Sequence, residues 1–191
     1  MNEETQKKKQ LLRVIVGSQA HGLATPESDY DYRGVFILPT VDFFRLGGTM
    51  KTTSWIEGKD DDTSWEIGHF LNMATHCNPT VLETLLAPFA PGKALGELTK
   101  AEEQLQDTAI ELRSLFPYVW NSLRVKEAFI GYGINQRKKF FENKDKRAPK
   151  YAVAYLRVLY QATELLSTGT FSINFEKTPI YETLKKWKKH L

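Results

Sequence analysis

Short apolar runs alternate with polar turns in the first half of the chain, whereas longer amphipathic segments fill the second half. Short runs rich in β-branched and aromatic residues predict strands. Such runs lie at residues 13–16, 29–38, 52–56 and 62–65. The last two predict a hairpin around a turn at residues 58–61. Helix-forming residues at 3–12, ending in Leu11 and Leu12, predict a short N-terminal helix.

In the second half, apolar residues recur at helical spacing. The predicted helices cover residues 67–77, 80–86, 99–116, 122–143 and 149–168, with a last helix from residue 178. Ser122 is the expected N-cap of the long central helix, and Gly169 suits a left-handed C-terminal position. Prolines and a glycine at 88–92 form a linker. Strands followed by helices predict an α+β chain with a core at residues 1–92 and a mostly helical lobe at residues 93–191.

The composition is that of a globular chain. Of its 191 residues, 41% are hydrophobic and 26% are charged, which allows a buried core. The net charge of +3 is unevenly distributed: residues 57–66 are acidic, and the chain from Arg113 onward is basic. This asymmetry is compatible with an anionic partner on the C-terminal lobe, and equally with a solvated helix surface.

The single cysteine, Cys77, cannot form a disulfide within the chain. It lies in a helical pattern, so we expect a buried thiol rather than a nucleophile. No apolar run approaches the ~18 residues that a membrane span needs. The N-terminal residues MNEETQKKKQLLR contain no apolar signal region. These features predict a cytoplasmic protein without a membrane partner.

Two acidic residues, Asp29 and Asp31, open the second apolar run. Side chains two residues apart in a strand point to the same side, with α-carbons about 6.6 Å apart. Two such carboxylates can share a hard cation such as Mg²⁺ or Mn²⁺, which completes its shell with water and substrate phosphates. Tyr30, between them, is expected to face the core.

The pair Gly17 and Ser18 closes the first apolar run. Glycine lets a phosphate approach the backbone, and a hydroxyl with free N–H groups at a turn can hold anionic oxygens. An isolated Asp-x-Asp is most often a solvated turn. A Gly-Ser pair that closes an apolar strand ten residues before an Asp-x-Asp is far more specific for metal and phosphate chemistry.

This arrangement resembles the signature of the DNA polymerase β-type nucleotidyltransferase superfamily. The fuller strings are GSQAHG at 17–22, SDYDYRGV at 28–35 and NPTVLE at 78–83. Together with the helical segment at 151–166, they resemble a narrower group, the RNA repair pathway polymerase β family. The resemblance spans about residues 13–169.

The resemblance implies a small mixed sheet with helices on one side. It implies Mg²⁺ or Mn²⁺ on Asp29 and Asp31, and nucleotide phosphates on Gly17 and Ser18. The expected reaction transfers a nucleoside monophosphate from an NTP such as ATP to an acceptor hydroxyl, which could belong to an RNA end. A catalytically degenerate module that binds nucleotide or RNA is the alternative, and transfer of AMP to a protein or small molecule is a third reading.

The superfamily also expects a third carboxylate on a nearby strand. Asp62 is the preferred residue, because Glu66 suits the first turn of a helix, where a carboxylate interacts with the helix dipole. Glu66 is the rival. His21 either contacts phosphate or base, or packs in a tight turn. Arg33 either binds the triphosphate or pairs with Asp31 as a structural cation.

Overall fold

The computed structural model describes residues 9–44, 52–56, 59–91, 100–143 and 146–189. Its sheet contains β1 (Lys9–Val16), β2 (Asp31–Ile37), β3 (Thr53–Ile56) and β4 (Lys59–Glu66). The strand order is β1-β2-β4-β3, with β2 and β4 parallel and the two outer pairs antiparallel. The sheet is therefore small and mixed, and the predicted α+β class is confirmed.

Two of the strands extend beyond the apolar runs that predict them. Residues 9–12 belong to β1, so the predicted helix is wrong there, and residues 3–8 lie outside the described residues. Leu12 is buried and pairs with Val35 of β2, and this pairing outweighs a modest helix propensity. Similarly, residues 59–61 belong to β4 rather than to a turn.

Apart from three short helices that the pattern does not predict, α1, α2 and α6, the described helices follow the predicted order. They are α1 (Gly17–His21), α2 (Thr40–Phe43), α3 (Ile67–Thr75), α4 (Pro79–Leu86), α5 (Lys100–Ser114), α6 (Phe116–Val119), α7 (Ser122–Phe141), α8 (Ala148–Thr168) and α9 (Tyr181–Lys188). The predicted helix at 99–116 ends earlier, and Pro117 lies in the first turn of α6. Proline is tolerated there because the first N–H groups of a helix have no intrahelical partner.

The ends of the long helices are fixed by local contacts. The Asn121 side chain accepts a hydrogen bond from the N–H of Arg124 at 3.0 Å. Asn121, and not the predicted Ser122, is therefore the N-cap of α7. Gly169 has a φ of 74° and ends α8 as predicted.

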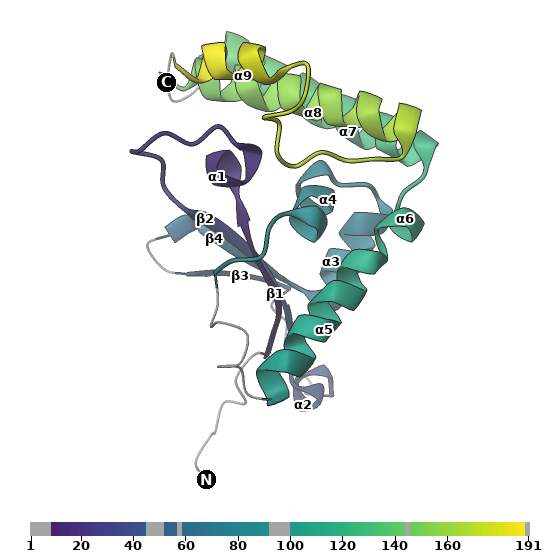
Figure 1. Ribbon diagram of the computed structural model, residues 1–191. Coiled ribbons are helices and arrows are strands. Elements are labelled where there is room, and N and C mark those ends of the chain that lie inside the picture. Colours follow the sequence, from purple (N-terminus) through teal and green to yellow (C-terminus); the bar gives the residue numbers. More distant parts are fainter. Residues whose placement is uncertain (1–8, 45–51, 57–58, 92–99, 144–145, 190–191) are drawn as a thin grey trace.

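The helices form two groups around the sheet. In Figure 1, α7, α8 and α9 lie together at one end of the molecule, while α3 and α4 lie beside the sheet. The main apolar cluster includes Val14 and Val35 of the sheet, Leu82 of α4 and Phe129 of α7. This core contains residues from both sides of the predicted boundary at residue 92. Within the described residues, no helix combines the length and apolar character needed to cross a membrane.

A second apolar cluster ties the segment before α9 to the segment after α1. It contains Leu23, Phe175 and Leu184. The N–H of Phe175 donates to the carbonyl of His21 at 3.1 Å. The hydroxyl of Tyr181 donates to the carbonyl of Gly22 at 3.3 Å. The chain between α8 and α9 therefore holds the C-terminal end of α1 in place.

We expect Phe175→Ala to lower the free energy of unfolding by about 3–5 kcal/mol, because Phe175 is fully buried and its ring packs edge-on against His21 and Tyr160. Urea denaturation followed by circular dichroism measures the change. The matched control is Phe44→Ala, since Phe44 is 79% exposed, and it should stay within about 0.5 kcal/mol of the parent. Equal effects of the two substitutions would contradict the packing described here.

Candidate functional site

The turn that follows β1 brings Gly17 against the Asp31 carboxylate. Asp31 is the register partner of Val16, the last residue of β1. Gly17 has a φ of 66°, a left-handed conformation that favours glycine. A Cβ at this position would lie 2.3 Å from Oδ2 of Asp31, so a larger residue would require the carboxylate or the turn to move. Gly17 and Asp31, expected from the sequence to lie at one site, are therefore neighbours.

Hydrogen bonds close the turn and hold the loop that leads to Asp29. The carbonyl of Ser18 accepts from the N–H groups of Gly22 and Leu23. The side chain of Gln19 donates to the carbonyl of Ser28 at 3.1 Å, which ties α1 to the residue before Asp29. Ser18 and Asp29 therefore belong to one connected loop at the end of the sheet.

The prediction that Tyr30 faces the core is wrong, because its side chain is 59% exposed. β2 begins at Asp31, so Asp29 and Tyr30 lie in the preceding loop and do not follow the alternation of a strand. Asp29 is exposed as well, whereas Asp31 is half-buried. The two carboxylates are therefore close in sequence but sit in different environments.

Asp62 lies on the opposite face of the sheet from Asp31. Oδ2 of Asp62 forms an ion pair with Nη2 of Arg13 at 3.4 Å. Arg13 pairs with Gly34 of β2, and paired residues share a face. Gly34 is an odd number of residues after Asp31, so the two face opposite sides. The structure does not bring Asp62 to Asp31.

Glu66 is the N-cap of α3. Its Oε2 accepts from the N–H groups of Gly68 and His69, at 2.7 and 3.1 Å. This role agrees with the sequence argument that Glu66 stabilises a helix start. Among the side chains that the structure describes, no group of three or more His, Cys, Asp or Glu residues is arranged to hold a metal ion.

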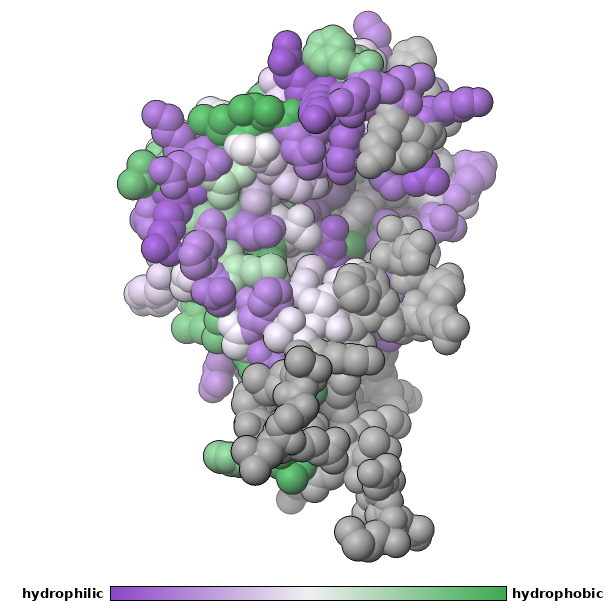
Figure 2. Space-filling view, turned by 180° about the vertical axis from the view of Figure 1, so that it is seen from behind, coloured by the Kyte–Doolittle hydropathy of each residue, from purple (hydrophilic) through white to green (hydrophobic). Residues whose placement is uncertain are grey.

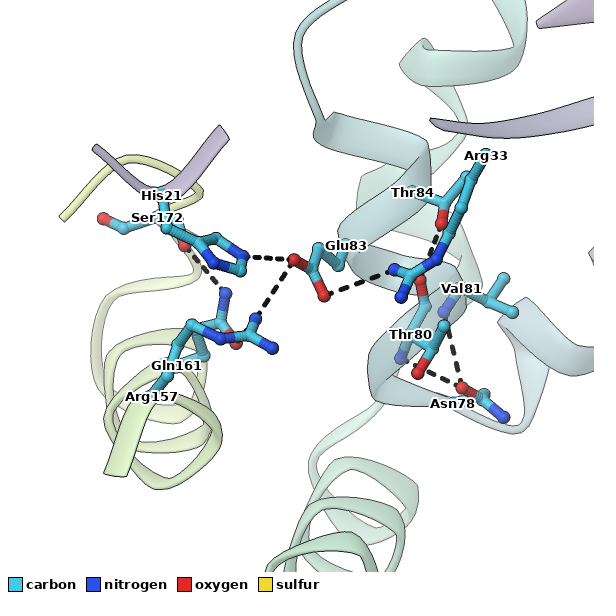
Figure 3. A network of polar contacts seen from close by, with 10 residues as sticks. All are labelled: His21, Arg33, Asn78, Thr80, Val81, Glu83, Thr84, Arg157, Gln161 and Ser172. Carbon is cyan, nitrogen blue, oxygen red and sulfur yellow. Dashed lines mark hydrogen bonds and ion pairs between the residues drawn. The ribbon is translucent and has the colours of Figure 1, made fainter. Parts of the chain in front are cut away.

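Beside the turn, a buried polar network is centred on Glu83 of α4 (Figure 3). Oε1 of Glu83 contacts Nε2 of His21 and lies 3.1 Å from Nη1 of Arg157. Oε2 lies 3.6 Å from Nη1 of Arg33. Gln161 extends the network by donating to the carbonyl of Ser172 at 2.9 Å. The network thus joins α1, β2, α4 and α8.

Burial and charge determine the protonation states in this network. Burial opposes ionisation of Glu83, but the charge of Arg157, followed by the interaction with the His21 imidazole and the charge of Arg33, holds the pKa of Glu83 well below the ordinary value. Burial, reinforced by Arg157, lowers the pKa of His21 from 6.5 to about 4. At neutral pH a neutral His21 therefore donates its Nε2–H to the Glu83 carboxylate, and two guanidinium groups balance the buried charge.

Arg33 and His21, both expected from the sequence to lie at the site, each contact Glu83 beside the turn. Nη1 of Arg33 forms the ion pair with Glu83, and this buried nitrogen has no hydrogen-bond partner among the described residues. Sequence reasoning missed Glu83 and Arg157. The available signal was an acidic residue inside the apolar run 81–86 and an arginine on the apolar face of α8.

The C-terminal helix brings positive charge to Asp31. Burial and the nearby charge of Lys150 lower the pKa of Lys188, and the Asp31 carboxylate opposes this shift. Lys188 is half-buried in the last turn of α9, and Lys150 is exposed in the first turn of α8. Lys188 therefore lies in the electrostatic surroundings of Asp31, and Lys150 lies in those of Lys188.

Acidification should destabilise the protein through His21. The unfolded chain takes up a proton near pH 6.5 and the folded chain only near pH 4, so stability is present above pH 6.5 and is lost as the pH falls. Between pH 7 and pH 5, we expect the free energy of unfolding to fall by about 2 kcal/mol through this residue. Urea denaturation at each pH measures this loss.

His21→Gln should remove this part of the pH dependence, whereas His76→Gln should retain it because His76 is exposed. The comparison uses the slope of stability against pH and not its absolute value, so a general destabilisation by the His21 substitution does not affect it. An identical slope in the parent and in His21→Gln would contradict the assignment.

Comparison with known proteins adds one finding. A family profile described as the RNA repair pathway DNA polymerase beta family matches residues 2–186. No curated protein and no solved structure gives a significant match. The match covers almost the whole chain and includes the Gly17–Asp31 turn and the Glu83 network. The chain belongs to the RNA repair pathway DNA polymerase beta family.

Proposed function

We propose that this chain is a Mg²⁺-dependent nucleotidyltransferase that transfers a nucleoside monophosphate from an NTP to an acceptor hydroxyl and releases pyrophosphate. The observation that carries the proposal is the contact between the left-handed Gly17 and the Asp31 carboxylate at the end of β1. It places a carboxylate beside a turn whose backbone a phosphate can approach. The family's name agrees with polymerase β-type chemistry in RNA repair, and an RNA end is the acceptor that we propose.

The residues at this turn fit a hard cation. Mg²⁺ is commonly bound by one or two carboxylates, with water and substrate phosphates as its other ligands. Asp29 and Asp31 would supply the two carboxylates, and the close approach of Gly17 leaves Asp31 without a bulky neighbour on that side. When bound, the cation would neutralise charge on the α-phosphate and lower the pKa of the acceptor hydroxyl.

The chain's own groups would orient the nucleotide. The N–H groups and the hydroxyl of the turn at Gly17 and Ser18 would bind phosphate oxygens, and Lys150 and Lys188 would balance the remaining negative charge. His21 and Arg33 would support the turn through Glu83 rather than contact the substrate. Positioning and electrostatics of this kind supply most of the rate in phosphoryl chemistry.

A second candidate function is a module that binds nucleotide or RNA without turnover. The observation that favours it is the place of Asp62 on the opposite face of the sheet, paired with Arg13. A site with only Asp29 and Asp31 could bind Mg²⁺ with nucleotide and still lack the third carboxylate that the superfamily expects. The two candidates differ in whether pyrophosphate is released.

The experiment that separates them incubates the chain with each labelled NTP, Mg²⁺ and either total RNA or total protein. The enzyme should release pyrophosphate and label one acceptor fraction. Asp29→Asn and Asp31→Asn should each lower the transfer by about 100-fold or more, because each removes a carboxylate that the metal needs. Asp107→Asn is the control, since Asp107 is exposed on α5 and should leave the transfer unchanged.

Full activity in both Asp variants would refute the proposed site. A Mg²⁺- and NTP-dependent rise in melting temperature without pyrophosphate release would favour the binding module. Asp62→Asn then decides the role of the third acid: if Asp62 acts only as the partner of Arg13, its substitution should change stability more than transfer.

Gly17→Ala should abolish nucleotide binding at the turn. An alanine Cβ would lie 2.3 Å from Asp31 and would require a left-handed conformation, so either the carboxylate or the turn must move. NTP-dependent thermal shift measures the loss. The matched control is Gly131→Ala, because a Cβ there meets nothing within 4 Å. Undiminished binding in Gly17→Ala would show that phosphates do not use this turn.

A further inference from the structure

The outer face of α7 carries a row of large apolar side chains that reach solvent. Leu123, Ile130, Ile134 and Phe141 are 66%, 45%, 61% and 68% exposed. At about 100° per residue, these four positions fall within about 20° of one line along the helix. In Figure 2, hydrophobic side chains reach the surface in the upper part of the molecule, where α7–α9 lie.

This row is separate from the face that α7 uses inside the molecule. The buried residues of α7 are Val125, Phe129, Gly133 and Gln136. Gly133 approaches Tyr155 and Leu159 of α8, which covers this inner face. Among the described residues, the outer row is therefore not part of the apolar core of a single copy, although exposed apolar residues in a line are unfavourable in water.

Two charged residues complete the outer row. Glu127 and Arg137 are exposed and occupy the positions between the apolar residues. The six positions are 123, 127, 130, 134, 137 and 141, with alternating spacings of four and three residues. This is the spacing of a seam along which two helices pack. Arg137 already lies over the ring of Phe141, 5.0 Å from its centre.

The row is complementary to itself when one copy is reversed. Turning a second α7 end for end about the level of residue 132 sets Leu123 against Phe141 of the other copy, and Ile130 against Ile134. The same operation sets Glu127 against Arg137 twice, once on each side of the centre. A parallel arrangement would instead oppose Glu127 to Glu127 and Arg137 to Arg137, which costs free energy.

We propose that the protein forms a two-fold symmetric dimer in which α7 packs antiparallel against α7 of a second copy. We choose a second copy as the partner because an antiparallel copy of α7 sets apolar side chains against apolar side chains and Glu127 against Arg137, whereas a parallel copy opposes like charges. A two-fold interface uses one surface patch on both subunits, so each residue of the row makes its contact twice. Helix α7 has 20 residues, which gives a seam about 30 Å long.

The first test measures the molar mass of the full chain by sedimentation equilibrium over a wide concentration range. The parent should be a dimer, and the double substitution Ile130→Glu with Ile134→Glu should be a monomer, because it places four carboxylates in the seam. Ile110→Glu is the matched control. Ile110 is 53% exposed on α5, away from the row, so this variant should remain a dimer. Circular dichroism checks that the parent and both variants are folded.

The second test examines the register through charge. Glu127→Arg alone and Arg137→Glu alone should each weaken the dimer about tenfold or more, because each opposes like charges twice. The double variant that carries both substitutions should recover the parent affinity. An equimolar mixture of the two single variants should form a mixed dimer, since each then supplies the charge that the other lacks.

A monomeric parent at every concentration would overturn the proposal. A dimer that the substitution of Ile130 and Ile134 leaves intact would overturn it as well, because the contact would then lie elsewhere. A dimer that needs the apolar residues but does not recover in the double charge variant would overturn the antiparallel register.

Discussion

The arrangement of helices on the sheet depends most on the compensation of one buried charge, the carboxylate of Glu83. A charge inside a protein is costly unless oppositely charged and hydrogen-bonding groups surround it. Glu83 obtains them from three other elements: His21 from α1, Arg33 from β2 and Arg157 from α8. Because Glu83 itself lies in α4, the charge is balanced only when all four elements are in place. The network therefore specifies one arrangement of helices on the sheet.

The candidate site inherits its geometry from this network. His21 ends α1, and Gly17, at the beginning of the same helix, touches Asp31. Arg33 follows Asp31 by two residues on the same strand, on the same face. The turn and the carboxylate are thus each connected to Glu83 through a few residues of backbone and one polar contact, made by His21 or by Arg33. A substitution of Glu83 would therefore alter the positions of both the Gly17 turn and the Asp31 carboxylate, although Glu83 does not contact the substrate in the proposed mechanism.

Much of this fold follows from local patterns in the sequence. The Gly-Ser pair, the Asp-x-Asp and the apolar runs around them are local features, and the structure places Gly17 beside Asp31 as they suggest. The face on which Asp62 lies could not be obtained in this way. It depends on the register between β2 and β4, which are parallel and far apart in sequence, and a shift of one residue reverses the face.

The Glu83 network is equally nonlocal, since its residues come from four elements. Residues 9–12 form a strand rather than a helix for the same reason, because they pair with residues of β2 that are distant in sequence.

The return of the chain between α8 and α9 onto α1 has a consequence for synthesis. The hydrogen bond between Tyr181 and the carbonyl at residue 22 joins positions 159 residues apart in sequence. Arg157 and Phe175 are likewise made late. A nascent chain that has produced the sheet and α4 would contain Glu83 without the charge of Arg157. Its turn at α1 would also lack the packing of Phe175 against His21. The sheet would therefore form early, whereas the turn at Gly17 and Ser18 would acquire its final shape only after α8 and α9 have been synthesised.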